Sequence, residues 1–489
     1  MKILVNSMAW VPKGSLDQAS LNRVRNRLTI WPKSASGFGQ DDPPPIRLYK
    51  ETKLALGVPR GFFEENMNGN EDIVVACSEG HPMSNFENKM RFEGPFKEQG
   101  DAIECALDYC SKREWGGFLL KAGCGFGKTN FALSLGHRLG RSTLILVHKE
   151  FFLAQWRDRI REFMPDAKIG LIQGSTCDYV GKDFTIAMMQ SLARDDGTKY
   201  PKDMYSAFGL IVSDECHRIG AQTWADLIPR FNAKWRLGLT ATPRRKDGSE
   251  GVFFKHIGQI LYSASSQSMI PKLSKCFTDF EAKPHKSRGR VTSVEKLTHV
   301  QLVSQLVEDH QRNRTIADTI ISAYLKNRKV MVISERKKHL DLINDAILDL
   351  LAEANREEGS RLKDELEAHQ SRLTIDYYVG GRKEAELEEA ERAMVVLATK
   401  QMVEEGLDIP AIDVLILATP LGDVEQTVGR VRRFCKPSKS KCPHLCPWRS
   451  ESCEGKPEPV VIDVIDRHNT KCRRKYLKRH EFYKEIGMV

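Results

Sequence analysis

Short apolar runs alternate with helix-like segments through most of this chain. The first series of runs lies at residues 118–120, 143–147, 185–188, 209–213 and 235–239. A second series lies at residues 330–333, 395–398 and 414–418. Each run is short enough for one buried strand, and strands that alternate with helices predict a parallel sheet whose ligands lie beyond the carboxyl ends of the strands. The pattern therefore predicts an α/β fold with two parallel-sheet lobes.

The segments around these two series set the predicted domain boundaries. Residues 1–92 open with a strand-like KILV and then turn irregular, which indicates a small N-terminal domain. That domain either helps to bind duplex nucleic acid or only packs against its neighbour. Residues 266–295 are rich in Ser, Lys and Pro, and they predict a linker between a first lobe at 93–265 and a second lobe at 296–489.

A glycine-rich turn follows the first apolar run. In the string FLLKAGCGFGKT, Gly123, Gly125 and Gly127 carry no Cβ, so that backbone N–H groups can approach phosphate oxygens closely. The helix that follows adds the positive end of its dipole. Lys128 can then reach the β- and γ-phosphates of a nucleotide, and the Thr129 hydroxyl can bind Mg²⁺. The string predicts a phosphate-binding loop.

Two carboxylates stand at the end of the fourth run. Asp214 and Glu215 directly follow the predicted strand at 209–213, in the string SDECH. A carboxylate at that position can hold Mg²⁺ through its water shell, and a second one can orient and deprotonate the attacking water. Asp214 is therefore predicted to serve the metal and Glu215 to act as the base. Gln99, upstream of the phosphate loop, is either a reader of an adenine edge or an ordinary exposed glutamine.

A group of polar side chains follows the last run of the second series. Gln426, Arg430 and Arg433 in QTVGRVRR are spaced three and four residues apart, so that a helix presents all three on one side. Guanidinium groups on one face suit a γ-phosphate that a different lobe holds. We therefore predict that these three residues take part in nucleotide hydrolysis.

Four cysteines lie directly after this segment, and they form a Cys-rich insertion at 435–453. Cys435, Cys442, Cys446 and Cys453 are separated by six, three and six residues in a Pro- and Ser-rich stretch. Four thiolates at this spacing can enclose Zn²⁺ where there is little hydrophobic core. The chain has twelve cysteines and no secretion signal, which indicates reduced thiols and favours a metal site over disulfides. Free thiols and an iron–sulfur cluster are the alternatives to zinc.

The charge of the chain points to a polyanionic partner. The net charge is +10, and residues 467–489 hold eight Lys or Arg residues against two Glu residues. Such a basic tail suits a nucleic acid, and a solvated helix end is the alternative. A charged stretch from Lys337 to about Leu373 predicts an inserted helical pair with a solvated face. No run is long enough to span a membrane and no leader opens the chain, so we expect a cytoplasmic protein of a bacterial or phage-infected cell.

Together these strings resemble the motifs of superfamily 2 helicases and translocases of the DExH type. AGCGFGKT resembles motif I, HKEFFLAQW motif Ia, MMQSL motif Ib, SDECH motif II and TATP motif III. VISERKKH resembles motif IV, ATKQMVEEGLD motif V and QTVGRVRR motif VI. The match spans residues 95–466. The QW, LTATPRRKDG and EGLDIP strings are most similar to the branch of UvsW, XPB and RadD, and phage branch-migration helicases are the nearest comparison.

The resemblance implies two RecA-like lobes that use ATP and Mg²⁺, and hydrolysis that is coupled to movement on DNA in the 3′ to 5′ direction. Gly406 and Asp408 of motif V would belong to the nucleotide site. The residues carried over as nucleic-acid contacts are Lys149, Gln190, Arg336 and Thr399. Such backbone contacts position a strand without reading its sequence.

The predicted function is that of an ATP-dependent helicase or translocase, expected to be a monomer, that unwinds or remodels single-stranded, forked or branched DNA in recombination, repair or replication. A DExH RNA helicase shares motifs I to VI and is the first alternative. The others are a motor subunit of a restriction or defence system and a nucleic-acid-binding adaptor without a working motor. The presence of Lys128, Glu215 and Arg433 argues against the adaptor.

Overall fold

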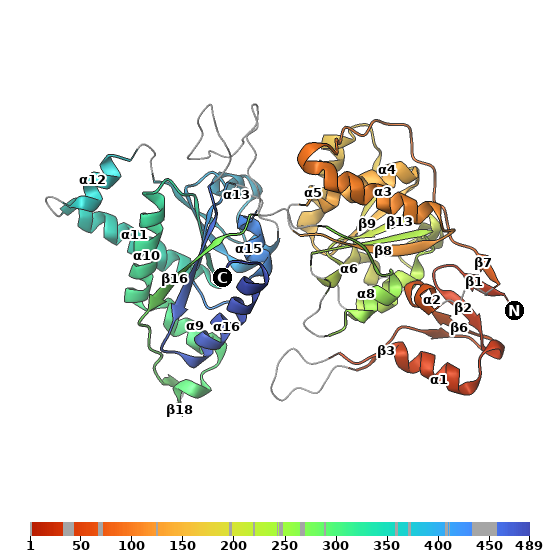
Figure 1. Ribbon diagram of the computed structural model, residues 1–489, viewed down its shortest axis with the longest axis horizontal. Helices are drawn as coiled ribbons and strands as arrows, with labels where there is room; N and C mark the ends of the chain where they lie inside the picture. Colours follow the sequence, from red (N-terminus) through yellow and green to blue (C-terminus); the bar gives the residue numbers. More distant parts are fainter. Residues whose placement is uncertain are drawn as a thin grey trace. The chain divides into compact units, whose positions relative to one another are not determined.

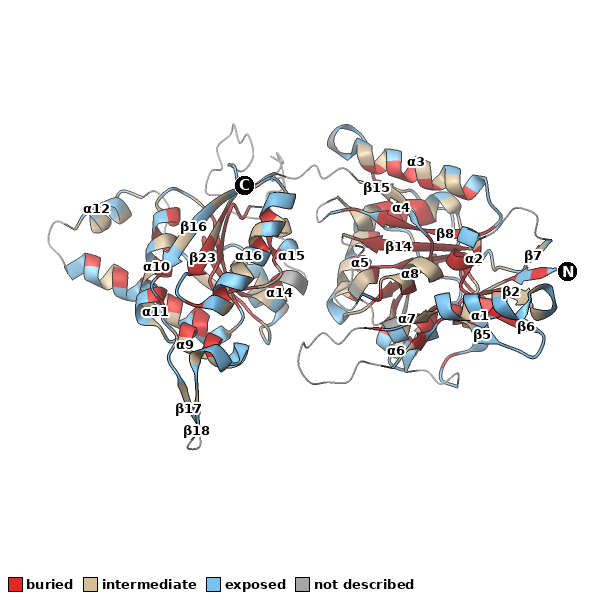
Figure 2. Cartoon of the chain, turned by 60° about the horizontal axis from the view of Figure 1, so that its bottom comes forward, coloured by how far each residue is buried: buried red, intermediate tan, exposed pale blue. Residues whose placement is uncertain are grey.

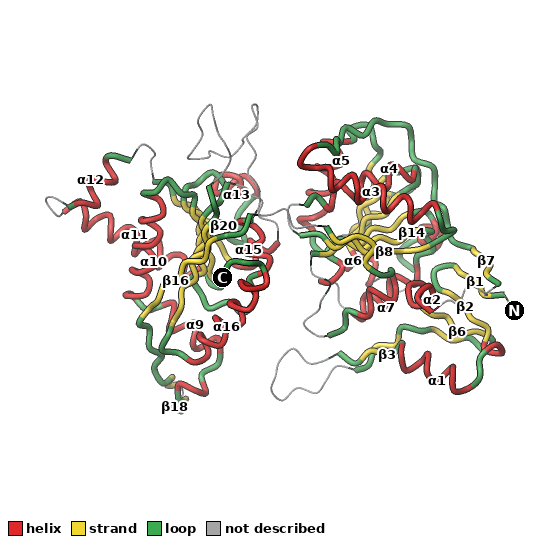
Figure 3. Tube along the Cα trace, viewed as in Figure 1, coloured by secondary structure: helices red, strands yellow, loops and turns green. Residues whose placement is uncertain are grey.

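The chain forms two compact units, Met1–Ser266 and Gln267–Val489. The computed structural model describes residues 2–489 except for 33–43, 67–71, 124–125, 195–197, 219–220, 242, 244–247, 265–268, 288–289, 357–359, 370–372, 406–408, 410 and 433–456. Each unit is an α/β body built on a mainly parallel sheet (Figures 1 and 3). The predicted fold class, with two parallel-sheet lobes, is therefore confirmed. The predicted Cys-rich insertion lies outside the described residues.

The N-terminal part of unit 1 is a small mixed sheet with two helices. Its strands run in the order β5-β6-β2-β1-β7, in which β1 and β7 are parallel and the other pairs antiparallel. Strands β3 and β4 pair separately. The elements are β1 Ile3–Val5, β2 Ala9–Pro12, α1 Gln18–Arg27, β3 Thr29–Ile30, β4 Ile46–Arg47, β5 Lys50–Glu51, β6 Ala55–Val58, α2 Arg60–Asn66 and β7 Ile73–Val75.

The main sheet of unit 1 runs in the order β11-β10-β12-β9-β13-β14-β8-β15. Strand β11 pairs antiparallel with β10, and the other pairings are parallel. The five apolar runs of the first series are strands β12, β9, β13, β14 and β8, as predicted. The elements are α3 Lys97–Ser111, β8 Gly116–Lys121, α4 Lys128–Leu139, β9 Thr143–Val147, α5 Glu150–Phe163, β10 Ile169–Gln173, β11 Thr176–Asp178, β12 Phe184–Met188, α6 Met189–Ala193, β13 Leu210–Ser213, α7 Ala221–Leu227, β14 Trp235–Thr240, α8 Gly251–His256 and β15 Ile260–Ser263.

Helices cover both faces of this sheet. Apolar side chains of α3, α4 and α5 pack with one face of the strands, and those of α6, α7 and α8 pack with the other. In Figure 1, α3 and α4 lie on one side of the sheet and α6 and α8 on the other. The central strands are buried along nearly their whole length (Figure 2). Burial on both faces explains why these strands are continuous apolar runs in the sequence.

A buried arginine joins the N-terminal part to the main sheet. Arg60, the first residue of α2, donates to the carbonyl oxygens of Ala233 and Lys234 at 2.6 Å each and of Gly116 at 3.0 Å. Burial lowers the pKa of Arg60 below its usual value. Since Ala233 to Lys234 and Gly116 lie at the amino ends of β14 and β8, this one side chain fixes α2 to the edge of the sheet opposite the phosphate loop.

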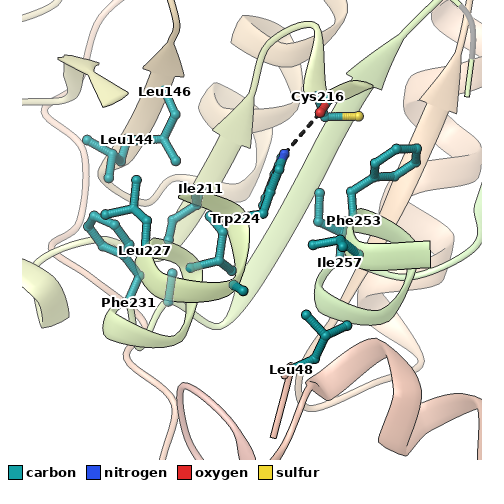
Figure 4. Close-up of a cluster of buried hydrophobic side chains, with 14 of the residues drawn as sticks. Leu48, Leu144, Leu146, Ile211, Cys216, Trp224, Leu227, Phe231, Phe253 and Ile257 are labelled. Carbon is teal, nitrogen blue, oxygen red and sulfur yellow. Dashed lines mark hydrogen bonds between the residues drawn. The ribbon is translucent and has the colours of Figure 1, made fainter. Parts of the chain in front are cut away.

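The N-terminal part also shares its apolar core with the sheet. The side chain of Leu48 lies in one cluster with Phe253 and Ile257 at the end of α8 (Figure 4). Helix α2 approaches α8 so closely that a Cβ on Gly61 would lie 2.7 Å from the carbonyl oxygen of Phe254. The first 92 residues therefore pack as a layer of unit 1.

The main sheet of unit 2 is parallel and runs in the order β16-β23-β22-β19-β21-β20. Helices α10 and α11 pack on one face, and α14, α15 and α16 pack on the other. Strands β19, β21 and β22 are the predicted second series. The elements are β16 Lys272–Thr278, β17 His285–Ser287, β18 Arg290–Thr292, α9 His299–Val307, α10 His310–Tyr324, β19 Val330–Ser334, α11 Lys337–Arg356, α12 Arg361–Glu367, β20 Ile375–Tyr378, α13 Glu384–Ala390, β21 Val395–Thr399, α14 Lys400–Glu405, β22 Val414–Leu417, α15 Glu425–Val431, β23 Val460–Asp466 and α16 Thr470–Glu485.

The structure corrects the linker prediction for residues 272–278. This stretch is strand β16, which pairs with β23 from Lys272 to Thr278 at the edge of the sheet. Three of its residues are Lys or Ser with exposed side chains. Such polar composition protects an edge strand from pairing with other chains, and it resembles that of a linker. The helical pair predicted after Lys337 is confirmed as α11 and α12.

Candidate functional site

The predicted residues of unit 1 lie at one edge of its sheet. Strands β9, β13, β14 and β8 are parallel neighbours, so their carboxyl ends lie side by side. Ala122, which follows β8, donates its backbone N–H to the carbonyl oxygen of Thr240 at the end of β14 at 2.9 Å. Asp214, which follows β13, donates its backbone N–H to Leu146 of β9 at 3.1 Å. The sheet therefore brings the phosphate loop and the two carboxylates together.

The phosphate loop turns from β8 into helix α4. Gly127 precedes the helix with a φ of 88°, a left-handed conformation that glycine adopts without steric cost. Lys128 and Thr129 are the first two residues of α4, where backbone N–H groups and the helix dipole favour an anion. Gly123 is exposed, and Gly125 lies outside the described residues.

Gln99 packs against this loop from helix α3. Its side chain is only 6% exposed, and its amide nitrogen donates to the carbonyl oxygen of Phe126. A Cβ on Gly127 would lie 2.9 Å from that amide nitrogen. The structure thus places Gln99 where it supports the loop, and the predicted contact of Gln99 with an adenine edge stays a prediction.

Lys128 and Glu215 form an ion pair beside the loop. Lys128 Nζ lies 3.0 Å from Glu215 Oε1 and donates to the Ala122 carbonyl oxygen at 3.3 Å. Glu215 has a φ of 44°, which costs a residue with a Cβ about 1–2 kcal/mol. Strained backbone of this kind persists where the surroundings fix it, and it is frequent at functional sites. The cation predicted to bind phosphate and the predicted base are therefore in direct contact.

Asp214 is buried beside this pair and accepts a hydrogen bond from a tryptophan. The indole N–H of Trp156 in helix α5 donates to Asp214 Oδ2 at 2.9 Å. Burial and the neighbouring Glu215 carboxylate raise the pKa of Asp214 to about 6, and the Trp156 hydrogen bond and Lys128 oppose this rise. The sequence prediction did not include Trp156. The QW string in motif Ia was visible, but nothing in the sequence joins it to a carboxylate 58 residues later.

His217 connects Glu215 with the end of strand β14. His217 Nδ1 lies 3.4 Å from Glu215 Oε2 and 2.9 Å from Thr240 Oγ1. Thr240 opens the TATP string that resembles motif III. Within unit 1 the observed link runs from Thr240 through His217 to Glu215, and His217 is a further residue that the sequence prediction omitted.

The donor atoms of this site fit Mg²⁺. Asp214 and Glu215 offer carboxylate oxygens and Thr129 a hydroxyl oxygen, which are the hard ligands that Mg²⁺ takes together with water. Among the described side chains that shift the pKa of Asp214, the charged ones are the Glu215 carboxylate and the Lys128 ammonium. The site therefore has two carboxylates against one cation among these side chains. Burial raises the pKa of Asp214 most, and the neighbouring Glu215 carboxylate raises it further. A divalent cation beside the two carboxylates would oppose this rise.

Two of the predicted nucleic-acid contacts meet at the same edge. Lys149 immediately precedes helix α5 after strand β9, and Gln190 lies in α6 after strand β12. The amide nitrogen of Gln190 donates to the carbonyl oxygen of His148. Because β9 and β12 are parallel neighbours, their following segments form one surface. Their contact with nucleic acid stays a prediction.

The other two predicted contacts lie together in unit 2. Thr399 ends β21 and is paired in register with Ser334, which ends β19. Arg336 donates from its guanidinium to Ser304 Oγ at 2.9 Å and to the Val300 carbonyl oxygen at 3.0 Å. These bonds fix helix α9 to the end of β19, so Arg336 has a packing role in addition to its predicted one.

Helix α15 carries two of the three predicted motif VI residues. Gln426 and Arg430 are one helical turn apart and half-buried, as the spacing predicts. Arg433 lies outside the described residues, and so do Gly406 and Asp408 of motif V. Their predicted roles stay predictions.

The described residues bear on two further features, metal-binding clusters and membrane helices. In the ranges that the structure covers, no group of three or more His, Cys, Asp or Glu is arranged to bind a metal ion. The four cysteines predicted to hold zinc, Cys435, Cys442, Cys446 and Cys453, lie outside those ranges. None of the helices in the described part of the chain has the length and apolar character that spanning a bilayer requires.

Comparison with known proteins finds helicases. A family described as type III restriction enzyme, res subunit, matches residues 93–245. A provisionally named ATP-dependent RNA helicase, L396, of Acanthamoeba polyphaga mimivirus is 25% identical over 484 residues, which cover 97% of this chain and 83% of the relative. The DNA 3'-5' translocase XPB2 of Sulfurisphaera tokodaii is 26% identical over 215 residues, 44% of each chain. The crystal structure of T4 UvsW matches with a TM-score of 0.39 and 15% identity, over 99% of this chain and 97% of that one.

The named relatives, a helicase and an XPB-type translocase, confirm the resemblance to superfamily 2 helicases. The matched family covers the segment from α3 to the TATP string, which contains motifs I to III. The relatives differ in the nucleic acid that their names state, RNA for the mimivirus protein and DNA for XPB2. The similarity therefore supports an ATP-dependent helicase and leaves the nucleic acid open.

Proposed function

We propose that this protein is an ATP-dependent DNA helicase or translocase that remodels forked or branched DNA in recombination, repair or replication. The observation that carries the proposal is the contact of Lys128 with Glu215 at the carboxyl ends of parallel strands, next to the buried Asp214. A phosphate-binding lysine, a metal carboxylate and a base at one sheet edge are what nucleotide hydrolysis requires.

Each group has a distinct part in the proposed reaction. The backbone N–H groups around Gly127 and the Lys128 ammonium bind the β- and γ-phosphates of ATP. Thr129 and Asp214 hold Mg²⁺, which neutralises phosphate charge when it is bound. Glu215 accepts a proton from the attacking water, and on ATP binding Lys128 exchanges its contact with Glu215 for the phosphates.

The motif VI residues supply two further cations, Arg430 and Arg433, and one neutral amide, Gln426, in this proposal. Gln426, Arg430 and Arg433 stabilise the charge that develops on the γ-phosphate, as an arginine finger does in related hydrolases. Lys149, Gln190, Arg336 and Thr399 contact the nucleic-acid backbone. Gly406 and Asp408 serve the nucleotide.

The choice of DNA follows from the similarity to UvsW and XPB. We propose 3′ to 5′ movement on the same ground. The test compares ATP hydrolysis by the full chain with single-stranded DNA, forked DNA, a four-way junction and RNA side by side, and adds unwinding of the same substrates. Greater stimulation by forks and junctions than by RNA is expected, and stimulation by RNA alone would contradict the proposal.

Two other functions have a specific observation in their favour. The mimivirus relative carries the name of an RNA helicase, which favours RNA as the substrate, and the same comparison of nucleic acids tests it. The matched family is described by a restriction-enzyme subunit, which favours a motor subunit of a restriction system. Such a subunit would hydrolyse ATP on duplex DNA without unwinding forks.

We also propose that the Cys-rich insertion binds zinc. Cys435, Cys442, Cys446 and Cys453 have the ligand type and number of a structural zinc site. Elemental analysis of the purified chain is expected to find one zinc ion per chain, and a Cys442→Ser, Cys446→Ser variant is expected to lose it. If elemental analysis finds neither zinc nor iron in the full-length protein, the four cysteines are free thiols.

A further inference from the structure

Trp156 packs in an apolar cluster and also donates a hydrogen bond to a carboxylate of the candidate site. Its side chain is 1% exposed in the apolar cluster between α5 and the sheet. An indole that is only packed can bond to any nearby carbonyl oxygen. Here its N–H donates to Asp214 Oδ2 at 2.9 Å. The chain thus places one of its largest buried side chains against the carboxylate assigned to Mg²⁺.

We propose that Trp156 is a positioning residue that orients the Asp214 carboxylate toward Mg²⁺. The inference rests on the proposed function, since it concerns the metal that accompanies ATP. A carboxylate can rotate about its last side-chain bond, and a donor fixed to one of its oxygens removes that freedom. Donors of this kind, behind the metal ligands, orient them and tune their affinity for the metal.

The chemistry of indole suits this task better than that of a charged donor. The indole N–H donates one hydrogen bond and carries no charge. A lysine or arginine at the same place would neutralise Asp214 and compete with the metal for it. Trp156 therefore fixes the direction of the carboxylate and leaves its negative charge available to a cation. The rigid α5 helix and the buried ring hold the donor in place.

A second tryptophan provides a matched control. Trp224 of α7 is also fully buried, and its indole N–H donates to the carbonyl oxygen of Cys216 at 3.0 Å (Figure 4). Trp224→Phe and Trp156→Phe therefore each remove one buried indole hydrogen bond near the same strand end. Only Trp156→Phe removes a bond to the carboxylate itself.

The experiment measures equilibrium binding of a fluorescent ATP analogue to the full chain at increasing Mg²⁺ concentration. Trp156→Phe is expected to raise the Mg²⁺ concentration at half-saturation by about 10- to 100-fold, the usual effect of losing a partner behind a metal ligand. Nucleotide affinity without Mg²⁺ is expected to stay unchanged. Trp224→Phe is expected to leave the Mg²⁺ dependence as in the unaltered chain. Thermal melting of both variants reports any loss of fold.

Two results would overturn the proposal. One is a Mg²⁺ midpoint for Trp156→Phe within about twofold of the unaltered chain, and the other is an equal shift for Trp224→Phe. If Trp156→Phe does not fold, β-(3-benzothienyl)alanine at position 156 replaces the indole N–H with sulfur at nearly the same shape. Its Mg²⁺ midpoint is then compared with that of the unaltered chain by the same criteria. Failure of the proposed function would look different, because the unaltered chain would then bind no nucleotide or would not depend on Lys128 for binding.

Discussion

Gly127 is a position at which the phosphate loop tolerates little change. A Cβ there would add left-handed strain of about 1–2 kcal/mol and would lie 2.9 Å from the Gln99 amide nitrogen. We expect Gly127→Ala to displace Gln99 or the loop and to weaken nucleotide affinity about tenfold, which corresponds to about 1.4 kcal/mol. Binding of a fluorescent nucleotide measures the change. Gly140→Ala is the control, because Gly140 ends the same helix with a φ of 66° and has open space around its Cβ position. Equal nucleotide affinities of the two variants would contradict the argument.

Glu215 is the residue on which hydrolysis should depend most. Glu215→Gln keeps the size of the side chain but removes the base, so we expect kcat to fall by about 10²- to 10⁴-fold while nucleotide binding persists. Steady-state ATP hydrolysis and nucleotide binding measure the two effects. Glu79→Gln is the control, since Glu79 forms exposed ion pairs with Arg141 and Lys234 away from the loop. A Glu215→Gln variant with normal kcat would assign the base to another group.

At this scale the sequence predicts residues that lie within one motif and misses partners that lie far apart in the chain. Lys128, Asp214 and Glu215 were predicted because each follows a strand within a recognisable string. Trp156 was missed, because its contact with Asp214, 58 residues later, exists only in the packed sheet. His217 lies in the SDECH string itself, but its contact with Thr240 joins two strand ends that only the sheet brings together. Chemistry that is local in sequence is predictable, and positioning across elements is not.

Helix α16 shows how an element that looks like a basic tail becomes part of a core. Arg479 makes two bonds to the buried Asp463 at 2.9 and 2.8 Å, and the Tyr483 hydroxyl donates to the same carboxylate at 2.9 Å. Lys475 donates to the Pro420 carbonyl oxygen at 2.9 Å. Arg479 is therefore bound within the core, and Lys475 holds the segment before α15. The spacing of Lys and Arg residues in the sequence does not show which of them form an ion pair with a buried aspartate.

Removing Arg479 should destabilise unit 2 strongly. Arg479→Met leaves Asp463 charged and unpaired in the core, so we expect a loss of about 3–5 kcal/mol. Calorimetric melting of the full chain measures it as a fall of about 10 °C in the transition of unit 2. Arg473→Met, on the exposed face of the same helix, is the control and should stay within about 0.5 kcal/mol. A small effect of Arg479→Met would mean that Asp463 becomes protonated at little cost.

At the scale of the whole molecule, the sequence predicted both sheets but not the way in which the first 92 residues join unit 1. The central strands were predictable because they are buried on both faces and therefore apolar throughout. The N-terminal strands are two to four residues long, which is too short for a clear period. Their attachment depends on Arg60 and Arg236, two buried arginines whose partners are backbone carbonyl oxygens. Every residue has a backbone carbonyl oxygen, so the sequence cannot show which of them accept from a buried arginine.

This shared packing predicts that the N-terminal part is not separable from unit 1. A chain that begins at residue 93 would expose the apolar surface of α8 and would remove the Ser7 carbonyl oxygen, which accepts from Arg236 at 2.7 Å. We expect such a chain to bind the dye ANS and to lose the calorimetric transition of unit 1, while the transition of unit 2 persists. Arg60→Met in the full chain tests another part of the same attachment, the bonds of Arg60 to the carbonyl oxygens at the amino ends of β8 and β14. It should destabilise unit 1 more than Arg23→Met on the exposed side of α1. If the shortened chain kept both transitions at their original temperatures, the first 92 residues would be an independent domain, and the carbonyl bonds of Arg60 would contribute little to its attachment.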